Sequence, residues 1–313
     1  GSEKIVILAA VWEGGSNYLA FNISGAYTVD WGDGTAAVNV AAATKTSKQL
    51  LWSSYSSGTL TTRGYRQAVI TITPQAGQTF TSVNFTVAHS SPPAPIYSTT
   101  FLDFVIAAPS LATFALGGNG PLQNHRILER ARFVGPNSIT DWGFNFGGLV
   151  SLRTCAATNG QGYDIWTSSA TAFGGLFNAC GALEACPTFS STSLVTGTSS
   201  MFANCSSMRS VPLFNTSAVT NAWGMFSFCA TLTSMPAFDW SSLVTGTSIM
   251  SGCSAITTVP WTVSPVLSAA GSMFANCYQL AAVPELDWSK VTTLSSCFNG
   301  CSALVDTSAL GHA

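Results

Sequence analysis

The chain has 313 residues, of which 8% are charged and 47% are hydrophobic, and its formal net charge at pH 7 is −2. A soluble domain usually carries about 25% charged residues, so neutral hydroxyl and amide side chains must solvate much of this surface. The small net charge disfavours nucleic acid as a partner, and the longest apolar run, 5–12, is too short for a membrane-spanning helix of about 20 residues.

Residues 4–90 contain short segments of mostly alternating apolar and polar residues, with Gly, Ser, Asn and Asp between them. These segments are 6–12, 18–23, 27–31, 49–52, 68–73 and 82–87. Short strands at regular spacing, separated by turn signals, predict a β-sandwich over residues 1–90.

The most specific motif of this region is the hexapeptide Asp30-Trp-Gly-Asp-Gly-Thr35. Its Asp33-Gly34 pair predicts a turn, because glycine adopts the left-handed conformation without strain. The hexapeptide resembles the Trp-Gly-Asp-Gly-Thr signature of PKD-type modules, and this resemblance implies an Ig-like sandwich of a kind that recurs in extracellular proteins. Asp30 and Asp33 alone supply too few oxygen ligands for calcium, which needs at least about six.

The segment 91–96 is rich in proline and predicts a stiff, extended linker. Divergent repeats are expected over 97–169, because 139–152 aligns with 219–235. An insertion is expected at 156–166, and 111–114 predicts an earlier extended rung. The main charge cluster also lies here. It is interpreted as a solvated turn or as a docking surface formed by Arg126, Arg130 and Arg132.

The region 170–313 is a regular repeat, with about 24 residues in each copy. We call the residues that occupy one position in successive copies a column. The cysteine column is Cys180, Cys205, Cys229, Cys253, Cys277 and Cys301. Three residues before it, the phenylalanine column contains Phe177, Phe202, Phe226, Phe274 and Phe298, and three residues after it, the leucine column contains Leu183, Leu232, Leu280 and Leu304.

Each copy predicts its own local structure. Apolar residues at i, i+1, i+4 and i+7 predict one face of a short helix, and the proline that follows Leu-x-x-Val predicts an extended rung before it. One copy cannot bury its apolar face alone, so the copies must stack. The fold predicted for the whole chain is mainly β with short helices: an N-terminal β-sandwich followed by a leucine-rich-repeat-type solenoid.

Residues 272–292, Ser-Met-Phe-Ala-Asn-Cys-Tyr-Gln-Leu-Ala-Ala-Val-Pro-Glu-Leu-Asp-Trp-Ser-Lys-Val-Thr, are similar to the BspA-type leucine-rich repeats. The resemblance covers about 170–307. It implies a repeat solenoid of the kind found in bacterial surface proteins and in phage structural proteins.

The nine cysteines leave three interpretations open, in decreasing order of preference: a buried ladder of reduced thiols, disulfides, and a metal site. Stacked copies bring column cysteines to ~4.8 Å, the spacing of strands, which overlaps the disulfide range, but parallel stacking disfavours the required orientation. A metal site would need a closer pair than Cys297 and Cys301. We expect no catalytic residue, no metal and no cofactor.

Two further sets of residues permit a functional interpretation. Asp239 and Asp287 are equivalent positions of the repeat, so they are expected to cap turns rather than to form a catalytic pair. The candidate contacts to a glycan or a partner are Trp240, Trp261 and Trp288, which would stack on sugar rings if exposed and otherwise pack in the core.

These features predict a non-enzymatic virion protein of a phage. The expected role is a tail-fibre or receptor-binding component, or a head decoration protein, that presents the solenoid to a host-surface glycan, a protein receptor or other virion proteins, as a trimer if it is a fibre. A bacterial cell-surface adhesin is the alternative, and a cell-wall glycan hydrolase is the third and least favoured.

Overall fold

The computed structural model describes residues 3–15, 17–89, 96–97, 100–116, 125–156, 163–261, 264–282 and 287–305. Most of the linker predicted at 91–96 and the middle of the insertion predicted at 156–166 lie outside these residues. The chain is mainly β and has two compact units. The N-terminal unit comprises 1–139 with 155–166, and the repeat unit comprises 140–154 with 167–313.

Three sheets form the N-terminal unit. The strands are β1 (Lys4–Trp12), β2 (Tyr18–Ile23), β3 (Tyr27–Asp30), β4 (Val38–Val40), β5 (Lys45–Gln49), β6 (Tyr65–Pro74), β7 (Ser82–Asn84), β8 (Ala88–His89), β9 (Ile96–Tyr97), β10 (Phe101–Ala107), β11 (Thr113–Ala115) and β12 (Arg130–Phe133). The orders are β12-β10-β1-β6-β3-β4, β11-β7-β2-β5 and β8-β9. Two 3-10 turns, η1 (Trp52–Ser54) and η2 (Ser57–Thr59), lie between β5 and β6.

The core of this unit lies between the two larger sheets. β1 and β6 pair antiparallel from Ile5 opposite Ile72 to Trp12 opposite Tyr65. Because successive side chains alternate across a strand, Ile5 and Ile7 point to one buried face. The rings of Phe104 on β10 and Phe114 on β11 are 5.9 Å apart, so side chains of the two sheets meet there.

Most strands predicted from alternation are present, but the strand predicted at 49–52 is wrong. The chain there leaves β5 at Gln49 and enters the 3-10 turn η1. β5 has the sequence Lys-Thr-Ser-Lys-Gln and lies at the edge of its sheet. An edge strand of this kind buries no apolar face, so it carries no alternating signal.

The predicted boundary at 91–96 does not coincide with the division into compact units. β10 lies within the expected divergent repeats, yet it pairs antiparallel with β1 and parallel with β12. β11, in the rung predicted at 111–114, pairs parallel with β7. The compact unit therefore extends to 139, because strands that are distant in sequence complete its sheets.

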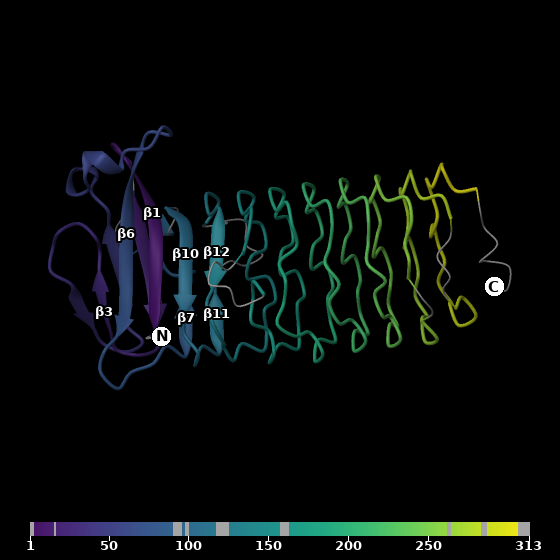
Figure 1. Ribbon diagram of the computed structural model, residues 1–313, viewed down its shortest axis with the longest axis horizontal. Coiled ribbons are helices and arrows are strands. Elements are labelled where there is room, and N and C mark those ends of the chain that lie inside the picture. The colour runs from purple at the N-terminus through teal and green to yellow at the C-terminus, as the bar shows by residue number, and fades with distance from the viewer. Residues whose placement is uncertain are drawn as a thin grey trace. The chain divides into compact units, whose positions relative to one another are not determined.

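The repeat unit consists of coils in which equivalent residues form parallel bridges (Figure 1). Each coil is named after the residue in its cysteine column. The bridged residues stand eight positions before that column and are Asp141, Ala172, Gly197, Asn221, Thr245, Ala269 and Thr293. The rung predicted at Leu-x-x-Val-Pro is therefore misplaced. A segment that ends in proline has lost a backbone donor and is a poor site for a continuous ladder.

The Met-Phe-x-x-Cys segment is not the predicted helix, because only every second N–H bonds within the coil. Those bonds join residues three apart, as from Cys205 N to Phe202 O at 3.1 Å. The alternate N–H groups donate to the next coil. In the Cys205 coil they join Thr198 to Asn221, Ser200 to Trp223, Phe202 to Met225 and Asn204 to Ser227, at 2.9, 2.7, 2.8 and 2.7 Å. We call these four bonds, repeated at each coil-to-coil step, the coil ladder.

Two positions of the coil ladder segment have a left-handed backbone. In the Cys205 coil they are Ser200 (φ 54°) and Asn204 (φ 62°). In most other coils the position of Ser200 is Gly or Ser, and the position of Asn204 is Gly, Asn or Ala. The exceptions are Phe144 at the first position (φ 54°) and Phe228 at the second (φ 61°). A left-handed conformation costs a bulky residue roughly 1–2 kcal/mol.

The cysteine column lies in the core, and its thiols make hydrogen bonds. The Sγ of Cys205 donates to Phe177 O of the preceding coil at 3.2 Å, and the same carbonyl accepts Cys180 N at 3.1 Å. The contact recurs in every coil from Cys180 to Cys301. All nine cysteines are free thiols. Cysteine thus fills the space of a small apolar residue and satisfies the second lone pair of a carbonyl.

The phenylalanine and leucine columns line the same core. The rings of Phe146, Phe177, Phe202 and Phe226 stack with successive centroid distances of 5.1, 5.5 and 5.7 Å. Leu183, Leu232 and Leu280 are buried, whereas Leu304 and Phe298 in the Cys301 coil are partly exposed.

The first coil of this unit has Leu149 in the cysteine column. Phe146 lies in the phenylalanine column, and Leu149 N bonds to Phe146 O as a column cysteine would. The alignment of 139–152 with 219–235 is therefore right at Asp141, which shares the bridged column with Asn221, but three residues out of register at Leu149.

Replacing Gly175 by serine should destabilise the repeat unit by about 1–3 kcal/mol. A Cβ there would lie 2.0 Å from Cε1 of Phe144, although serine is common in this left-handed column. In a Phe144→Ser background the same replacement should cost much less. Urea unfolding of the two single variants and the double variant measures the coupling. Equal losses in both backgrounds would show that the ring is not the cause.

The column thiols should resist labelling and make folding sensitive to alkali. Burial raises the pKa of Cys180 and Cys229 to about 12, from 9.0. The stabilisation is complete below pH 9 and is lost as the pH rises toward 12, because the unfolded thiols ionise first. We expect native thiols at pH 8 to react with an aromatic disulfide far more slowly than in urea, with the partly exposed Cys301 reacting first. Equal rates in both states would contradict this core.

Candidate functional site

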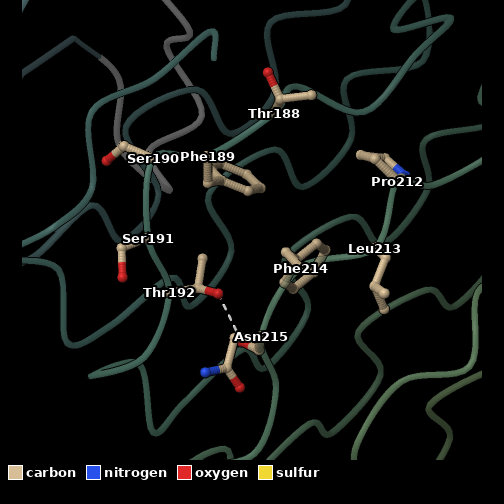
Figure 2. Close-up of a pocket in the computed structure, with 9 residues that line it drawn as sticks. All are labelled: Thr188, Phe189, Ser190, Ser191, Thr192, Pro212, Leu213, Phe214 and Asn215. Carbon is tan, nitrogen blue, oxygen red and sulfur yellow. Dashed lines mark hydrogen bonds between the residues drawn. The ribbon is translucent and has the colours of Figure 1, made fainter. Parts of the chain in front are cut away.

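A groove opens on the repeat unit between the Cys180 and Cys205 coils. It has a volume of about 300 Å³, at the lower end of the range for ligand sites. It is lined by Thr188, Phe189, Ser190, Ser191, Thr192, Pro212, Leu213, Phe214 and Asn215. Figure 2 shows Phe189 and Phe214 in the middle of this set, with Ser190 and Ser191 on one side and Pro212 and Leu213 on the other.

The groove lies where the repeat has one extra residue. Cys180 and Cys205 are 25 residues apart, whereas later neighbours in the cysteine column are 24 apart. Thr192 Oγ1 donates to Asn215 O, and Thr216 Oγ1 donates to Asp239 O, both at 2.6 Å, so Thr192 and Thr216 are equivalent. Phe189 and Phe214 also occupy one column, nine residues after the cysteine. The extra residue between these two markers is Ser190.

Aromatic and aliphatic groups form the apolar part of the groove. The rings of Phe189 and Phe214 meet edge to face with centroids 5.6 Å apart, and both remain partly exposed. Leu213 is 68% exposed. An exposed leucine beside two accessible rings gives the groove a surface on which an apolar ligand face can pack.

Hydroxyl and amide groups form the polar part. Ser190 Oγ accepts Thr167 N at 2.8 Å, so its own proton is available to a ligand. Asn215 Oδ1 accepts Ser217 N at 2.9 Å and Ser217 Oγ at 2.7 Å, which fixes the amide plane. The nine lining residues include no charged side chain.

The tryptophans named as candidate sugar contacts are buried, so the core-packing alternative holds and the contact with a sugar is wrong. Trp240 is 0% exposed, Trp261 2% and Trp288 5%. Trp240 and Trp288 occupy the inward-pointing column of Thr192 and Thr216. Trp240 packs on Phe238 and Trp261, and Trp288 packs on Phe298.

Two of the exposed aromatic residues of the repeat unit were missed from the sequence. Trp223 is 51% exposed and Phe228 is 56% exposed, both in the Cys229 coil. In the column of Trp223 the other coils have Gly, Ser or Thr. In the column of Phe228 they have Gly, Ala or Asn. An aromatic residue in a column of small residues is the signal that finds them, as the 25-residue spacing is the signal for the groove.

The three arginines of the charge cluster do not share one role. Arg130 and Arg132 lie on β12, a strand rather than a turn, and both bond the buried carboxylate of Asp103 on β10. Arg126 is exposed. Two of the three therefore neutralise Asp103, and a docking surface formed by all three stays a prediction.

Titratable groups elsewhere have structural partners. His125 is fully buried, its ring stacks on Phe101, and burial lowers its pKa to about 4. Asp239 and Asp287 accept the N–H groups of Ser241 and Ser289, both at 2.9 Å, as turn caps.

The two aspartates of the hexapeptide also have partners. Asp30 accepts Gly32 N, and Asp33 accepts Thr35 N and Lys48 Nζ. Burial opposes ionisation of Asp33, but the bonds from Lys48 and Thr35 prevail and lower its pKa to about 2.

Within the ranges that the structure describes, no group of three or more His, Cys, Asp or Glu side chains could hold a metal ion. The same residues include no helix of the length and apolarity that crossing a bilayer requires.

Deleting Ser190 should close the groove and leave the repeat unit folded. The Cys180 coil would then have the 24 residues of the later coils, with the loss of one hydrogen bond, worth about 1 kcal/mol. A crystal structure and urea unfolding of the variant check both parts. Loss of cooperative unfolding, or a groove that persists, would show that Ser190 is not the residue that opens it.

Comparison with known proteins gives one match. Residues 171–309 match the model of a family described as a Mycoplasma protein of unknown function, DUF285. No curated protein and no solved structure matches the chain. The family match covers less than half of the chain and concerns the repeats alone, from the residue before the bridged Ala172 to residue 309.

Proposed function

We propose that the protein is a non-enzymatic binding protein of a phage virion, a tail-fibre or receptor-binding component or a head decoration protein. In this proposal the N-terminal unit is a PKD-like β-sandwich and the stacked coils form a BspA-type leucine-rich-repeat solenoid. The observation that carries the proposal is the groove between the Cys180 and Cys205 coils, a ligand-sized hollow on a framework that is otherwise regular.

The framework supports a binding role because its reactive side chains are used for packing. The thiols of the cysteine column are buried and bonded to carbonyl groups. Asp239 and Asp287 cap turns. What the coils present to a partner is the groove, with the exposed rings of Trp223 and Phe228 on the Cys229 coil as additional contacts. Aromatic side chains are the usual anchors of such contacts.

The near absence of charge on the coils supports a neutral partner. Among the described residues from 167 to 305, the charged side chains are Glu184, Arg209, Asp239, Asp287 and Lys290. Binding to such a surface relies on hydrogen bonds and shape, and each contact is individually weak. Many copies on one particle would raise the avidity by about 10²–10⁴-fold.

A bacterial cell-surface adhesin is the second candidate. The matched family is described as a Mycoplasma protein, which points to a bacterial source. The same groove and exposed rings would serve an adhesin, so the two candidates differ in where the protein is displayed.

Immunogold labelling with an antibody to this chain should decorate virions. Gold at the tail tip is expected for a receptor-binding component and gold over the capsid for a decoration protein. Labelling of the envelope of uninfected cells would replace the first candidate by the adhesin. Release of reducing sugars from cell-wall glycan by the purified chain would contradict both.

A further inference from the structure

The groove has a chemical character that selects one class of ligand. A charged ligand buried there would need a counter-charge, and none of the nine lining residues supplies one. A purely apolar ligand would leave Ser190 and Asn215 without water and without a partner. The remaining class combines apolar faces with neutral hydroxyl groups.

Asn215 has free donors for such a ligand at the edge of the groove. Its Oδ1 is occupied by the N–H and the hydroxyl of Ser217, and its Nδ2 makes no hydrogen bond to another described residue. The amide therefore presents two N–H donors in a fixed plane. Ser190 adds a third donor, because its oxygen already accepts the N–H of Thr167.

The apolar side of the groove complements these donors. Phe189 and Phe214 are partly exposed within it, and Leu213 projects with 68% of its surface accessible. A pyranose ring has axial C–H groups that pack on such a surface and hydroxyl oxygens that accept from fixed donors.

We propose that this groove binds a neutral glycan, with Asn215 Nδ2 and Ser190 Oγ donating to its oxygens at opposite edges of the groove and Phe189, Leu213 and Phe214 packing on its C–H faces. This assignment rests on the proposed binding function and names the ligand class for it. It also gives the extra residue a role, because Ser190 both opens the groove and supplies a donor.

The repeat itself provides a matched variant. Asp239 and Asp287 stand in the Asn215 column and cap the same turn with a carboxylate. Asn215→Asp therefore keeps the cap to Ser217 while it removes both amide donors and adds a negative charge. Asp239→Asn makes the reverse exchange in a coil that does not line the groove.

The test uses the whole chain on an array of immobilised neutral oligosaccharides containing glucose, galactose, mannose or N-acetylglucosamine, with sialylated and sulfated counterparts. We expect binding to at least one neutral member. Asn215→Asp should weaken it by about tenfold or more, deletion of Ser190 should abolish it, and Asp239→Asn should leave it unchanged. Thermal melting of the three variants separates these effects from unfolding.

Two results would overturn the assignment: no binding to any neutral sugar, or binding by Asn215→Asp at wild-type strength with the fold intact. Preference for the sialylated or sulfated members would also contradict it. If immunogold still labels virions while no sugar of the array binds, the virion role stands and the receptor is a protein. If virions are labelled and another sugar class or another site binds, the virion role stands and only the assignment of this groove falls. If virions and cell envelopes are both unlabelled while the array result holds, the sugar site stands and the proposed role falls.

Discussion

The coil ladder is the constraint on which the repeat unit depends. From the Leu149 coil to the Cys277 coil, the N–H groups of four alternate residues bond to the next coil, and those two and four residues before the cysteine column and at the column itself close turns within their own coil. Each of these N–H groups therefore has a partner, as a buried backbone requires. This division also forces two left-handed residues into each coil, such as Ser200 and Asn204, and so determines where small residues must stand.

The thiol column follows from the same geometry. The carbonyl in the phenylalanine column accepts an N–H from its own coil and still has one lone pair in the core. A cysteine of the next coil fills that space and donates to it. An alanine or valine would fill the space without the bond, and a serine would carry a more polar group into an apolar core. The recurrence of cysteine thus needs no redox or metal chemistry to explain it.

Because the bonds of the coil ladder are the same in successive coils, the chain between two ladder segments can vary in length and side chains. The extra residue Ser190 lies about halfway between two ladder segments, and on both sides of it the bonds keep the register of the other coils. The chain absorbs the insertion locally, and the groove results. Trp223 and Phe228 are variations of a different kind, since they change side chains on the ladder segment and leave its backbone bonding unchanged.

The sequence predicted the period, the aligned columns and the stacking of coils, because those features depend on spacing that repeats along the chain. It failed where two structures share one pattern. Apolar residues at i, i+1, i+4 and i+7 suit alternating turns as well as a helix. The sequence left Trp240 open between an exposed sugar contact and the core, because the inward direction of this side chain comes from the column of Thr192, which only the coil bonds reveal. β10 was missed as the partner of β1, and β12 as the partner of β10, because β1 and β10 lie at opposite ends of the sequence of the N-terminal unit.

The ladder segment is vectorial: its four donors face the following coil and its four acceptors face the preceding one. A whole coil can therefore be duplicated or excised during evolution with no change in how its neighbours bond, and lengthening proceeds head to tail. Two such segments brought together by a twofold axis would oppose donor to donor or acceptor to acceptor. Any twofold-symmetric assembly of this protein must consequently be built from surfaces other than the ladder.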